Sequence, residues 1–371
     1  MMKKLLFLVF ICFCLSGCSP VNNDVTVIKF STWGSASEIE ILKPIIKEFE
    51  RQNPNIKIKV MHIPQNYFQK LHLLFASNTP PDVVFINNLN LPVYADFLTD
   101  LTPYINIKDF YPKSIEGMKY DGKLLAVPRD ISILVVYYNK ALFKKYSVSY
   151  PDESWTLDDL IKKACAFKNV YGISYEPLIY YALPFMVYCG GGILDKNFNY
   201  IADSENSKKG LKLYKDLAYK HHAAPLPEQT GSKTQAQMFI EGRLAMHLSG
   251  RWLVPKYRTC ANFEWDVVNF PRYSAPCDVS GWGLSSSCRH KSDAVKFILF
   301  LSSKNNIKKM SSDGLIIPSR TDAAQSLEFL NDRPKHSYLF LNSALYSKNS
   351  FVSKDYCRMI DKLNDKIFNN P

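Results

Sequence analysis

Short apolar runs and helical patterns alternate along the first hundred residues of the chain. Three runs, VTVIKF at 25–30, IKIKVMHI at 56–63 and DVVFIN at 82–87, are rich in β-branched residues and predict strands. Between them, two stretches place apolar residues at helical spacing: Ile41, Leu42, Ile45, Ile46 and Phe49, then Phe68, Leu71, Leu74 and Phe75. Because strands that are apolar throughout need cover on both faces, this order predicts an α/β lobe with a mainly parallel sheet. Pro44 predicts a kink or a late start in the first helix.

The same alternation continues over the rest of the chain. We expect a strand from about Ile131, and further strands in GRLAMHLSGRW at 242–252, DVVNFP at 266–271 and GWGLSSS at 281–287. The stretch AVKFILFLSS at 294–303 predicts an amphipathic helix. A chain of 371 residues is too long for one ordinary core, so we expect two lobes.

The first 24 residues have a different pattern. An apolar run at 5–15 follows two lysines; it is too short to span a bilayer and is typical of a signal peptide. The sequence LSGC at 15–18 resembles the lipobox of bacterial lipoproteins, in which the cysteine is acylated and becomes the new N-terminus. We therefore expect a signal peptide at 1–17 and a lipid-anchored linker at 18–24, with Cys18 as the lipidated residue. An ordinary signal peptide with an incidental cysteine is the alternative.

Composition and charge are those of a folded globular chain with a basic surface. The chain is 47% hydrophobic and carries a formal net charge of +12. Its lysines are scattered singly or in pairs such as Lys144 and Lys145, without the basic blocks of a nucleic-acid-binding arm, so we expect no nucleic-acid partner. Beyond residue 18, no CxxC or HxxxH spacing predicts a metal site. Disulfides and free thiols are both open for the six cysteines there: Cys165, Cys189, Cys260, Cys277, Cys288 and Cys357.

An ordered set of motifs from about residue 25 to 320 resembles the family 1 extracellular solute-binding proteins of ATP-binding-cassette importers, especially those for sugars. The matching pieces are STWGSASE, NPNIKIKV, PPDVVFIN, DGKLLAVPRDISILVVYYNKALF, YEPLIY, the Gly190-Gly191-Gly192 turn, FIEGRLAMHLSGRW, GWGLSSS, AVKFILFLSS and DGLIIPSR. The resemblance implies an α/β, two-lobed periplasmic-binding-protein-like fold of class II type, with the ligand cleft between the lobes. It also implies a monomer without a cofactor that delivers a sugar to permease subunits, in the periplasm or at the outer face of the cytoplasmic membrane.

In this family the chain crosses between the lobes several times. Carried onto this sequence, the crossings fall at 128–134, 281–286 and 314–319. Both lobes are then discontinuous in sequence: lobe one comprises 24–131 plus 283–314, and lobe two comprises 132–282 plus 315–371.

The expected ligand suggests the candidate site residues. A sugar presents a face of C–H groups and an edge of hydroxyls, so its site needs flat aromatic surfaces beside hydrogen-bond acceptors and donors. In α/β sheets ligands bind beyond the carboxyl ends of strands. The candidate aromatic platforms are Trp33, Trp252, Trp282, Tyr67 and Tyr180. The candidate polar contacts are Ser35, Glu38, Asn66, Asn87, Asp130, Ser132, Glu176, Ser249, Arg251 and Gly281. The resemblance places Ser132 at a position that contacts ligand in related proteins.

Several candidates also have a purely structural interpretation. A tryptophan can belong to the core, and for Trp282 this interpretation is as well supported as ligand contact. Asp130 can form a hinge salt bridge with Arg129, and Glu176 can be a solvated loop carboxylate.

Other functions are weighed against sugar binding. A sugar phosphate such as glycerol phosphate is the alternative ligand, and a carbohydrate-active lipoprotein enzyme is the alternative of another class. The acidic pairs at 152–153 and 158–159 flank Trp155, where Ser154 or Thr156 followed by acids predicts a helix N-terminus. No GxSxG or HExxH motif occurs either, so we expect no catalytic residue. Tyr180 and Tyr181 leave ferric-ion capture open. The glycine triplet at 190–192 lacks phosphate-loop spacing and predicts a loop with positive φ.

Overall fold

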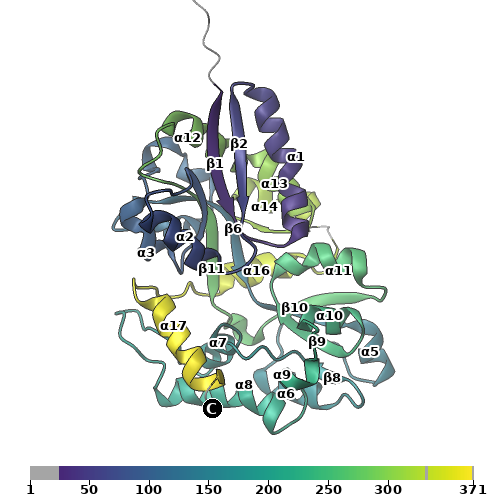
Figure 1. Cartoon of the computed structure of the whole chain (residues 1–371). Coiled ribbons are helices and arrows are strands. Elements are labelled where there is room, and N and C mark those ends of the chain that lie inside the picture. Colours follow the sequence, from purple (N-terminus) through teal and green to yellow (C-terminus); the bar gives the residue numbers. More distant parts are fainter. Residues whose placement is uncertain (1–24, 331–332, 370–371) are drawn as a thin grey trace, which may run out of the picture.

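Two separate sheets organise the structure into an upper and a lower lobe (Figure 1). The computed structural model describes residues 25–330 and 333–369. The upper sheet has the strand order β12-β6-β11-β3-β1-β2. Its strands are β1 Thr26–Thr32, β2 Ile56–His62, β3 Val83–Asn87, β6 Ala126–Ile133, β11 Cys277–Leu284 and β12 Ile317–Pro318.

The upper sheet is mixed, whereas we expected it to be mainly parallel. The strand β1 pairs in parallel with β2 and β3, as the strand and helix alternation predicts. However, β11 pairs antiparallel with β3 and with β6, and β12 pairs antiparallel with β6. The N-terminal strands are parallel because a helix carries the chain back between them, while β11 enters the sheet from the lower lobe in the opposite direction.

The lower sheet has the order β10-β7-β9-β8. Its strands are β7 Val135–Asn139, β8 Tyr171–Ile173, β9 Leu244–Ser249 and β10 Trp265–Asn269. The strand β7 pairs antiparallel with β9 and β10, and β8 pairs in parallel with β9. A short hairpin of β4 Lys119–Tyr120 and β5 Lys123–Leu124 leads into β6.

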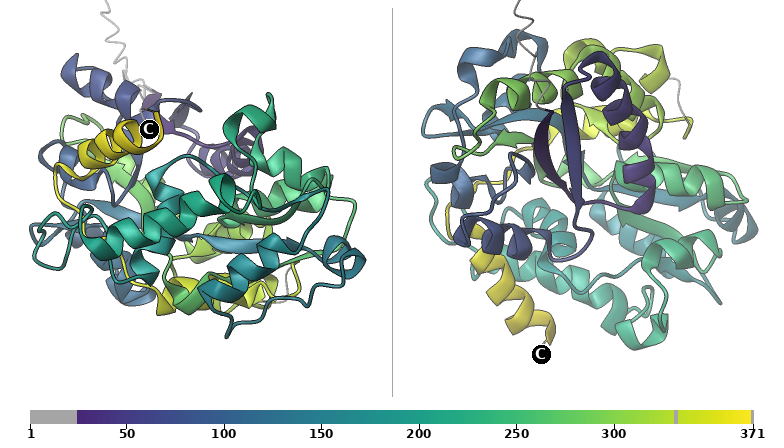
Figure 2. Two further views of the ribbon diagram at one scale, coloured as in Figure 1. Left: turned by 90° about the horizontal axis from the view of Figure 1, so that it is seen from below. Right: turned by 45° about the horizontal axis from the view of Figure 1, so that its top comes forward.

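Helices cover both sheets. Those of the upper lobe are α1 Ala36–Gln52, α2 Tyr67–Ala76, α3 Leu91–Tyr94, α4 Pro112–Gly117, α12 Lys291–Leu301, α13 Lys304–Ser312 and α14 Thr321–Ala324. Those of the lower lobe are α5 Lys140–Lys145, α6 Leu157–Cys165, α7 Ile179–Tyr188, α8 Glu205–Tyr219, α9 Pro227–Thr230, α10 Gln235–Ile240 and α11 Val254–Cys260. The chain ends with α15 Leu327–Leu330, α16 Tyr338–Tyr346 and α17 Tyr356–Asn364, of which α17 (yellow in Figure 2) packs against α7. None of the helices in the described ranges combines the length and apolarity needed to span a bilayer.

Helix α1 begins well before Pro44, so the predicted late start is wrong. The Ser35 side chain caps it by accepting a hydrogen bond from the backbone N–H of Glu38. Pro44 lies inside the helix and is exposed. The backbone carbonyl four residues earlier, at Glu40, loses its helical donor there and can be hydrated on the exposed face, which explains why the proline is tolerated.

The predicted start of α6 is confirmed. Thr156 and Asp159 form a capping box, in which the Thr156 hydroxyl accepts from the Asp159 N–H and the Asp159 carboxylate accepts from the Thr156 N–H. The Thr156 hydroxyl also donates to Oδ2 of Asp159 over 2.7 Å, and this bond, followed by the one from the Thr156 N–H, lowers the pKa of Asp159. The acidic pairs around this turn therefore serve the helix N-terminus.

Each lobe has its own hydrophobic core. The chain passes from one core to the other between Val127 and Ile131, between Cys277 and Val279, and between Ile316 and Ile317. Val279 and Trp282 consequently pack in the upper lobe, although we expected the lower lobe to extend to residue 282. Likewise, Ile131 packs in the lower core, and Leu315, Ile316 and Ala323 pack in the upper core, although we expected residue 131 in the upper lobe and 315–371 in the lower lobe. The exact lobe boundaries stay a prediction. The six cysteines beyond residue 18 are all free thiols.

Candidate functional site

A cavity of about 560 Å³ lies between the lobes, beside β6 and β11. Predicted site residues that line it are Trp33, Ser35, Glu38, Asn87, Asp130, Ser132, Tyr180, Arg251 and Trp252. Among its other lining residues are Leu89, Arg129, Ile131, Leu253, Lys256, Asp278, Ser280, Leu315 and Ile317. A cavity of this size is within the range of roughly 300–1,000 Å³ that small-molecule pockets occupy. Because both lobes contribute, a ligand held there would contact both.

The upper wall carries Trp33, which directly follows β1. Its indole is half-buried, with its centroid 4.1 Å from the ring of Phe85 and 4.9 Å from the ring of Tyr67. The Tyr67 hydroxyl lies 2.8 Å from Oγ of Ser31 and is buried with it. Tyr67 therefore supports the Trp33 ring from behind and is not the second platform that we expected.

The floor of the cavity carries a buried triad of charges. Arg129 of β6 donates from Nη1 to Oε1 of Glu38 and from Nε to Oδ1 of Asp130, each over 2.7 Å. The Ser132 hydroxyl donates to Oδ2 of Asp130 over 3.3 Å. Burial raises the pKa of Glu38, and the nearby Arg129 guanidinium opposes that shift. The predicted salt bridge between Arg129 and Asp130 is confirmed, and its members also line the cavity.

The lower wall carries Trp252, in a short helical turn after β9. The backbone carbonyl of Gly250 accepts a hydrogen bond from the Tyr137 hydroxyl over 2.7 Å, which fixes the chain where it leaves the strand. A side chain at Gly250 would collide with the indole, since its Cβ would lie 1.9 Å from Cζ3 of Trp252. The glycine is therefore needed for the half-buried ring of Trp252 to lie over the backbone at the cavity wall.

Arg251 lines the same cavity but is bound mainly within the protein. The residue is 2% exposed, its Nη2 donates to the carbonyl of Ser311 over 3.2 Å, and its guanidinium lies over the ring of Phe329 at 4.5 Å. These contacts join the turn after β9 to α13 and α15. Arg251, which we expected as a polar contact of the ligand, thus has a largely structural position.

Six predicted residues do not line the cavity: Asn66, Tyr67, Glu176, Ser249, Gly281 and Trp282. Trp282 lies inside β11 with 1% exposure, in the upper core, so its structural interpretation is correct. Ser249 is buried in β9, and Gly281 pairs with β6 where the register shifts. Glu176 is half-buried, with its N–H bound to the Tyr214 hydroxyl, and burial raises its pKa. Asn66 is exposed at the start of α2.

Sequence reasoning missed Asp278, Ser280 and Lys256 as lining residues. Alternation along β11 could have suggested the first two, because Asp278 and Ser280 share one face of the strand. Val279, which lies between them and faces the other way, belongs to the upper core. No sequence pattern pointed to Lys256, because its position at the cavity depends on how α11 packs on the lower lobe.

The sequence matches a known family. The sequence profile described as bacterial extracellular solute-binding protein matches residues 44–336. The chain belongs to this family. The family consists of non-catalytic proteins that bind solutes for ABC transporters.

Relatives of this solute-binding protein cover most of its length. It is 24% identical over 308 residues to the galactooligosaccharide-binding protein of Bacillus subtilis, covering 77% of this chain and 72% of the relative. It is 24% identical over 340 residues to the maltodextrin-binding protein MdxE of the same organism, covering 85% and 78%. Among solved structures, the ABC substrate-binding protein Lmo0181 from Listeria monocytogenes, in complex with cycloalternan, superposes with a TM-score of 0.86 and 26% identity over 93% of this chain and 94% of that one. These likenesses bear out the α/β periplasmic-binding-protein fold.

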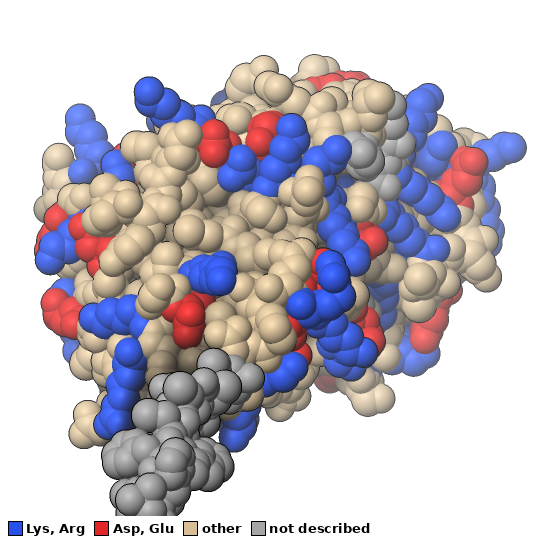
Figure 3. Space-filling model, turned by 90° about the horizontal axis from the view of Figure 1, so that it is seen from above, with Lys and Arg blue, Asp and Glu red and all other residues tan. Residues whose placement is uncertain are grey.

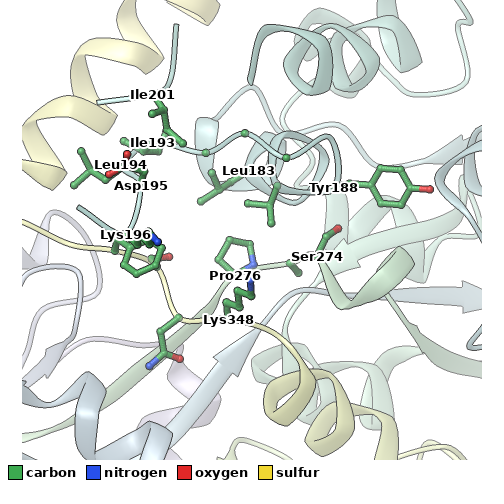
Figure 4. A pocket seen from close by; sticks show the side chains of 18 of the residues that line it. Leu183, Tyr188, Ile193, Leu194, Asp195, Lys196, Ile201, Ser274, Pro276 and Lys348 are labelled. Carbon is green, nitrogen blue, oxygen red and sulfur yellow. The ribbon is translucent and has the colours of Figure 1, made fainter. Parts of the chain in front are cut away.

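This solute-binding protein has a second cavity, of about 460 Å³, whose lining includes Leu183 of α7 (Figure 4). Its lining includes the glycine triplet, of which Gly190 and Gly192 have φ of +83° and +158°, so the predicted positive-φ loop is confirmed. The lining is largely apolar, with Leu183, Ile193 and Pro276 visible in Figure 4. The cavity contains none of the predicted site residues, and we do not place the solute there.

The outer surface fits the expected charge distribution. On the face in Figure 3, lysines and arginines are spread over the surface and are interspersed with acidic and uncharged side chains. The net charge is therefore distributed and is not concentrated in one basic groove on this face.

Proposed function

We propose that this solute-binding protein is a lipoprotein that captures a neutral oligosaccharide between its lobes and delivers it to the permease of an ABC transporter. Its relatives are named for galactooligosaccharides and maltodextrin, and Lmo0181 was solved with cycloalternan. A maltotriose-binding protein of Thermus thermophilus shares the fold with a TM-score of 0.78 at 21% identity.

The observation that carries the proposal is the pair Trp33 and Trp252. The two half-buried indoles come from opposite lobes and line one cavity. Exposed indole faces stack on the C–H faces of sugar rings, and Glu38, Asp130 and Asn87 offer acceptors for the hydroxyl edge. Two platforms and a polar floor fit an oligosaccharide better than a small ion.

The charges in the cavity favour a neutral ligand over a sugar phosphate. Three carboxyl groups line the cavity, those of Glu38, Asp130 and Asp278. Three cations line the cavity as well. Arg129 already binds two of the carboxylates, Arg251 donates to a backbone carbonyl, and Lys256 of α11 is the third, so the lining has no excess of positive charge to attract a phosphate. UgpB of Mycobacterium tuberculosis, solved with glycerophosphocholine, has the same fold with a TM-score of 0.77 and 18% identity, so this ligand class belongs in the test.

Binding would act through the two lobes. A ligand that contacts both walls stabilises the closed arrangement and shifts the population toward it. The closed form is then the one that docks productively on the permease. Cys18, the expected lipid attachment site, lies outside the described residues.

A thermal-shift screen tests the proposal. Purified protein is melted with maltotriose, longer maltodextrins, galactooligosaccharides, glycerol phosphate and glycerophosphocholine. Ligand at about 100 times its Kd stabilises the native state by roughly 2.7 kcal/mol, so a neutral oligosaccharide should raise the melting midpoint. A shift with glycerol phosphate or glycerophosphocholine alone would support the alternative ligand, and mass spectrometry should find the bound sugar unchanged.

A further inference from the structure

The strand β11 brings a carboxyl group, that of Asp278, to the junction of two cavities. Asp278 lines the cavity between the lobes and also a narrow adjoining cavity of about 50 Å³ that continues toward α17. It is 7% exposed and lies opposite Ser132 in the pairing of β11 with β6. Its position is therefore at the inner end of the solute cavity, where β11 leaves the lower lobe.

The carboxyl group of Asp278 is incompletely satisfied within the protein. Its Oδ1 is buried and accepts no hydrogen bond from any described residue. The two other carboxyl groups of the cavity differ, because Glu38 and Asp130 both accept from Arg129 over 2.7 Å. A buried acceptor without a donor costs about 1 to 3 kcal/mol, so Asp278 has acceptor capacity that a ligand can use.

The groups around Asp278 do not neutralise it. The titratable groups that interact with it are Tyr180 of α7, Tyr356 and Cys357 of α17, and its chain neighbour Cys277. Within the described residues, no cation of α7 or α17 interacts with it. The strand β6 contributes Ser132 as its register partner and Asp130 nearby, and Lys256 of α11 lines the same cavity. The side chains of Ser350 and Asn88 favour its charged form and only partly offset the effect of burial.

We propose that Asp278 is a specificity-determining residue of the solute cavity, whose carboxylate accepts hydrogen bonds from hydroxyl groups of the sugar ring bound nearest to β11. The inference rests on the proposed function and concerns the same cavity. A hydroxylated neutral ligand supplies the missing donors, whereas a phosphate at this place would repel the carboxylate. Asp278 thereby selects neutral sugars against their phosphates.

This contact makes binding release protons near neutral pH. Burial raises the pKa of Asp278 to about 7, so both of its forms are populated there. Hydrogen bonds from sugar hydroxyls stabilise the charged form and lower the pKa in the complex. Affinity should therefore rise as the pH rises from about 6 to 8, and binding should release a fraction of a proton near pH 7.

Titration calorimetry with maltotriose and galactotriose tests the inference. The wild-type chain, Asp278→Asn and Ser350→Ala are titrated at several pH values in phosphate and in Tris, whose different ionisation heats reveal proton release. We expect Asp278→Asn to bind about tenfold more weakly at pH 8 and to lose the buffer-dependent heat. Asp278→Ser serves as a second variant if Asp278→Asn does not fold.

The control distinguishes ligand contact from hinge structure. Ser350 faces Asp278 from the segment after α16 and does not line the solute cavity. Because Ser350 favours the charged form of Asp278, Ser350→Ala should move the pH dependence of affinity to higher pH, and at high pH it should bind within about twofold of wild type. The inference is overturned if Ser350→Ala loses as much affinity as Asp278→Asn at high pH too, or if Asp278→Asn binds and releases protons like the wild type. Those results leave the proposed function standing; a wild-type chain that binds neither these sugars nor any oligosaccharide of the thermal screen would overturn both.

Discussion

Arg129 of β6 donates from its Nη1 to Oε1 of Glu38 of α1 over 2.7 Å, and both side chains are buried at the floor of the solute cavity. The same guanidinium lies 4.1 Å from the centroid of Phe85, the ring on which Trp33 packs. One cation thus links the start of α1, the middle of β3 and β6. Residues expected to contact ligand also hold the cavity wall in place.

Glu38→Gln should destabilise the protein. The variant leaves Arg129 paired with Asp130 alone, so we expect less than the 3 to 5 kcal/mol of a fully broken buried pair, or about 2 kcal/mol in the free energy of unfolding. Denaturant unfolding measures this value. Glu48→Gln on the same helix is the control, because Glu48 binds Arg51 at the exposed surface and should change stability little. Equal effects of the two variants would contradict the assignment.

Trp252→Ala should weaken binding without unfolding the protein. The indole is half-buried at the cavity wall, so its loss removes a stacking surface and should reduce sugar affinity by about 1 to 3 kcal/mol, or roughly tenfold to a hundredfold. Calorimetry below the melting midpoint measures affinity. Trp282→Ala is the matched variant, since Trp282 is in the upper core and its truncation should cost about 3 to 5 kcal/mol of stability. If Trp252→Ala melts as early as Trp282→Ala and the remaining folded protein keeps full affinity, Trp252 is not a platform.

Arg251→Ala should lower the stability of the protein more than Trp252→Ala does. The guanidinium lies over Phe329 and Phe340 and donates to the Ser311 carbonyl, so its removal leaves a buried gap and an unsatisfied acceptor, at a cost of about 2 to 4 kcal/mol. Thermal and denaturant unfolding of Arg251→Ala and Trp252→Ala give the comparison. A variant that keeps wild-type stability and loses only affinity would restore the view that Arg251 contacts the ligand.

Cys18→Ser should release the protein from membranes. If Cys18 carries acyl chains, each buried methylene adds about 0.8 kcal/mol to membrane binding, and the substitution removes that anchor. Membrane fractionation and labelling with a tagged fatty acid report the result. Cys14→Ser is the control, because Cys14 belongs to the expected signal peptide and its change should leave the label in place. A labelled, membrane-bound Cys18→Ser protein would refute the lipobox interpretation.

The sequence predicted correctly those strands and helices whose formation depends on a single local pattern. Runs rich in β-branched residues located β1, β2 and β3, and helical spacing located α12. The acids that follow Ser154 or Thr156 located the start of α6. Strand ends placed Trp33 and Trp252 at the cavity, because ligands of α/β sheets bind there. The mixed sheet and the burial of Trp282 depend on which strand becomes the neighbour of β3, and this is β11, almost 200 residues later in the chain. No local pattern contains that pairing.

Asp278 should make the unliganded protein less stable as the pH rises. Its pKa of about 7 in the folded protein is above the ordinary value of 3.8, chiefly because of burial, so the folded state retains a proton that the unfolded state has already lost. Its stabilising contribution is complete below about pH 4 and is lost as the pH rises to about 7, with an upper limit on the order of 4 kcal/mol.

Buried His247, whose pKa burial lowers to about 3, has the opposite slope, since its contribution is lost as the pH falls below about 6.5. The wild-type curve alone therefore cannot isolate Asp278, and the difference between wild type and Asp278→Asn in denaturant unfolding at a series of pH values does. That difference should shift in favour of Asp278→Asn between pH 4 and pH 7; a constant difference over this range would mean that Asp278 is ionised in the folded protein throughout.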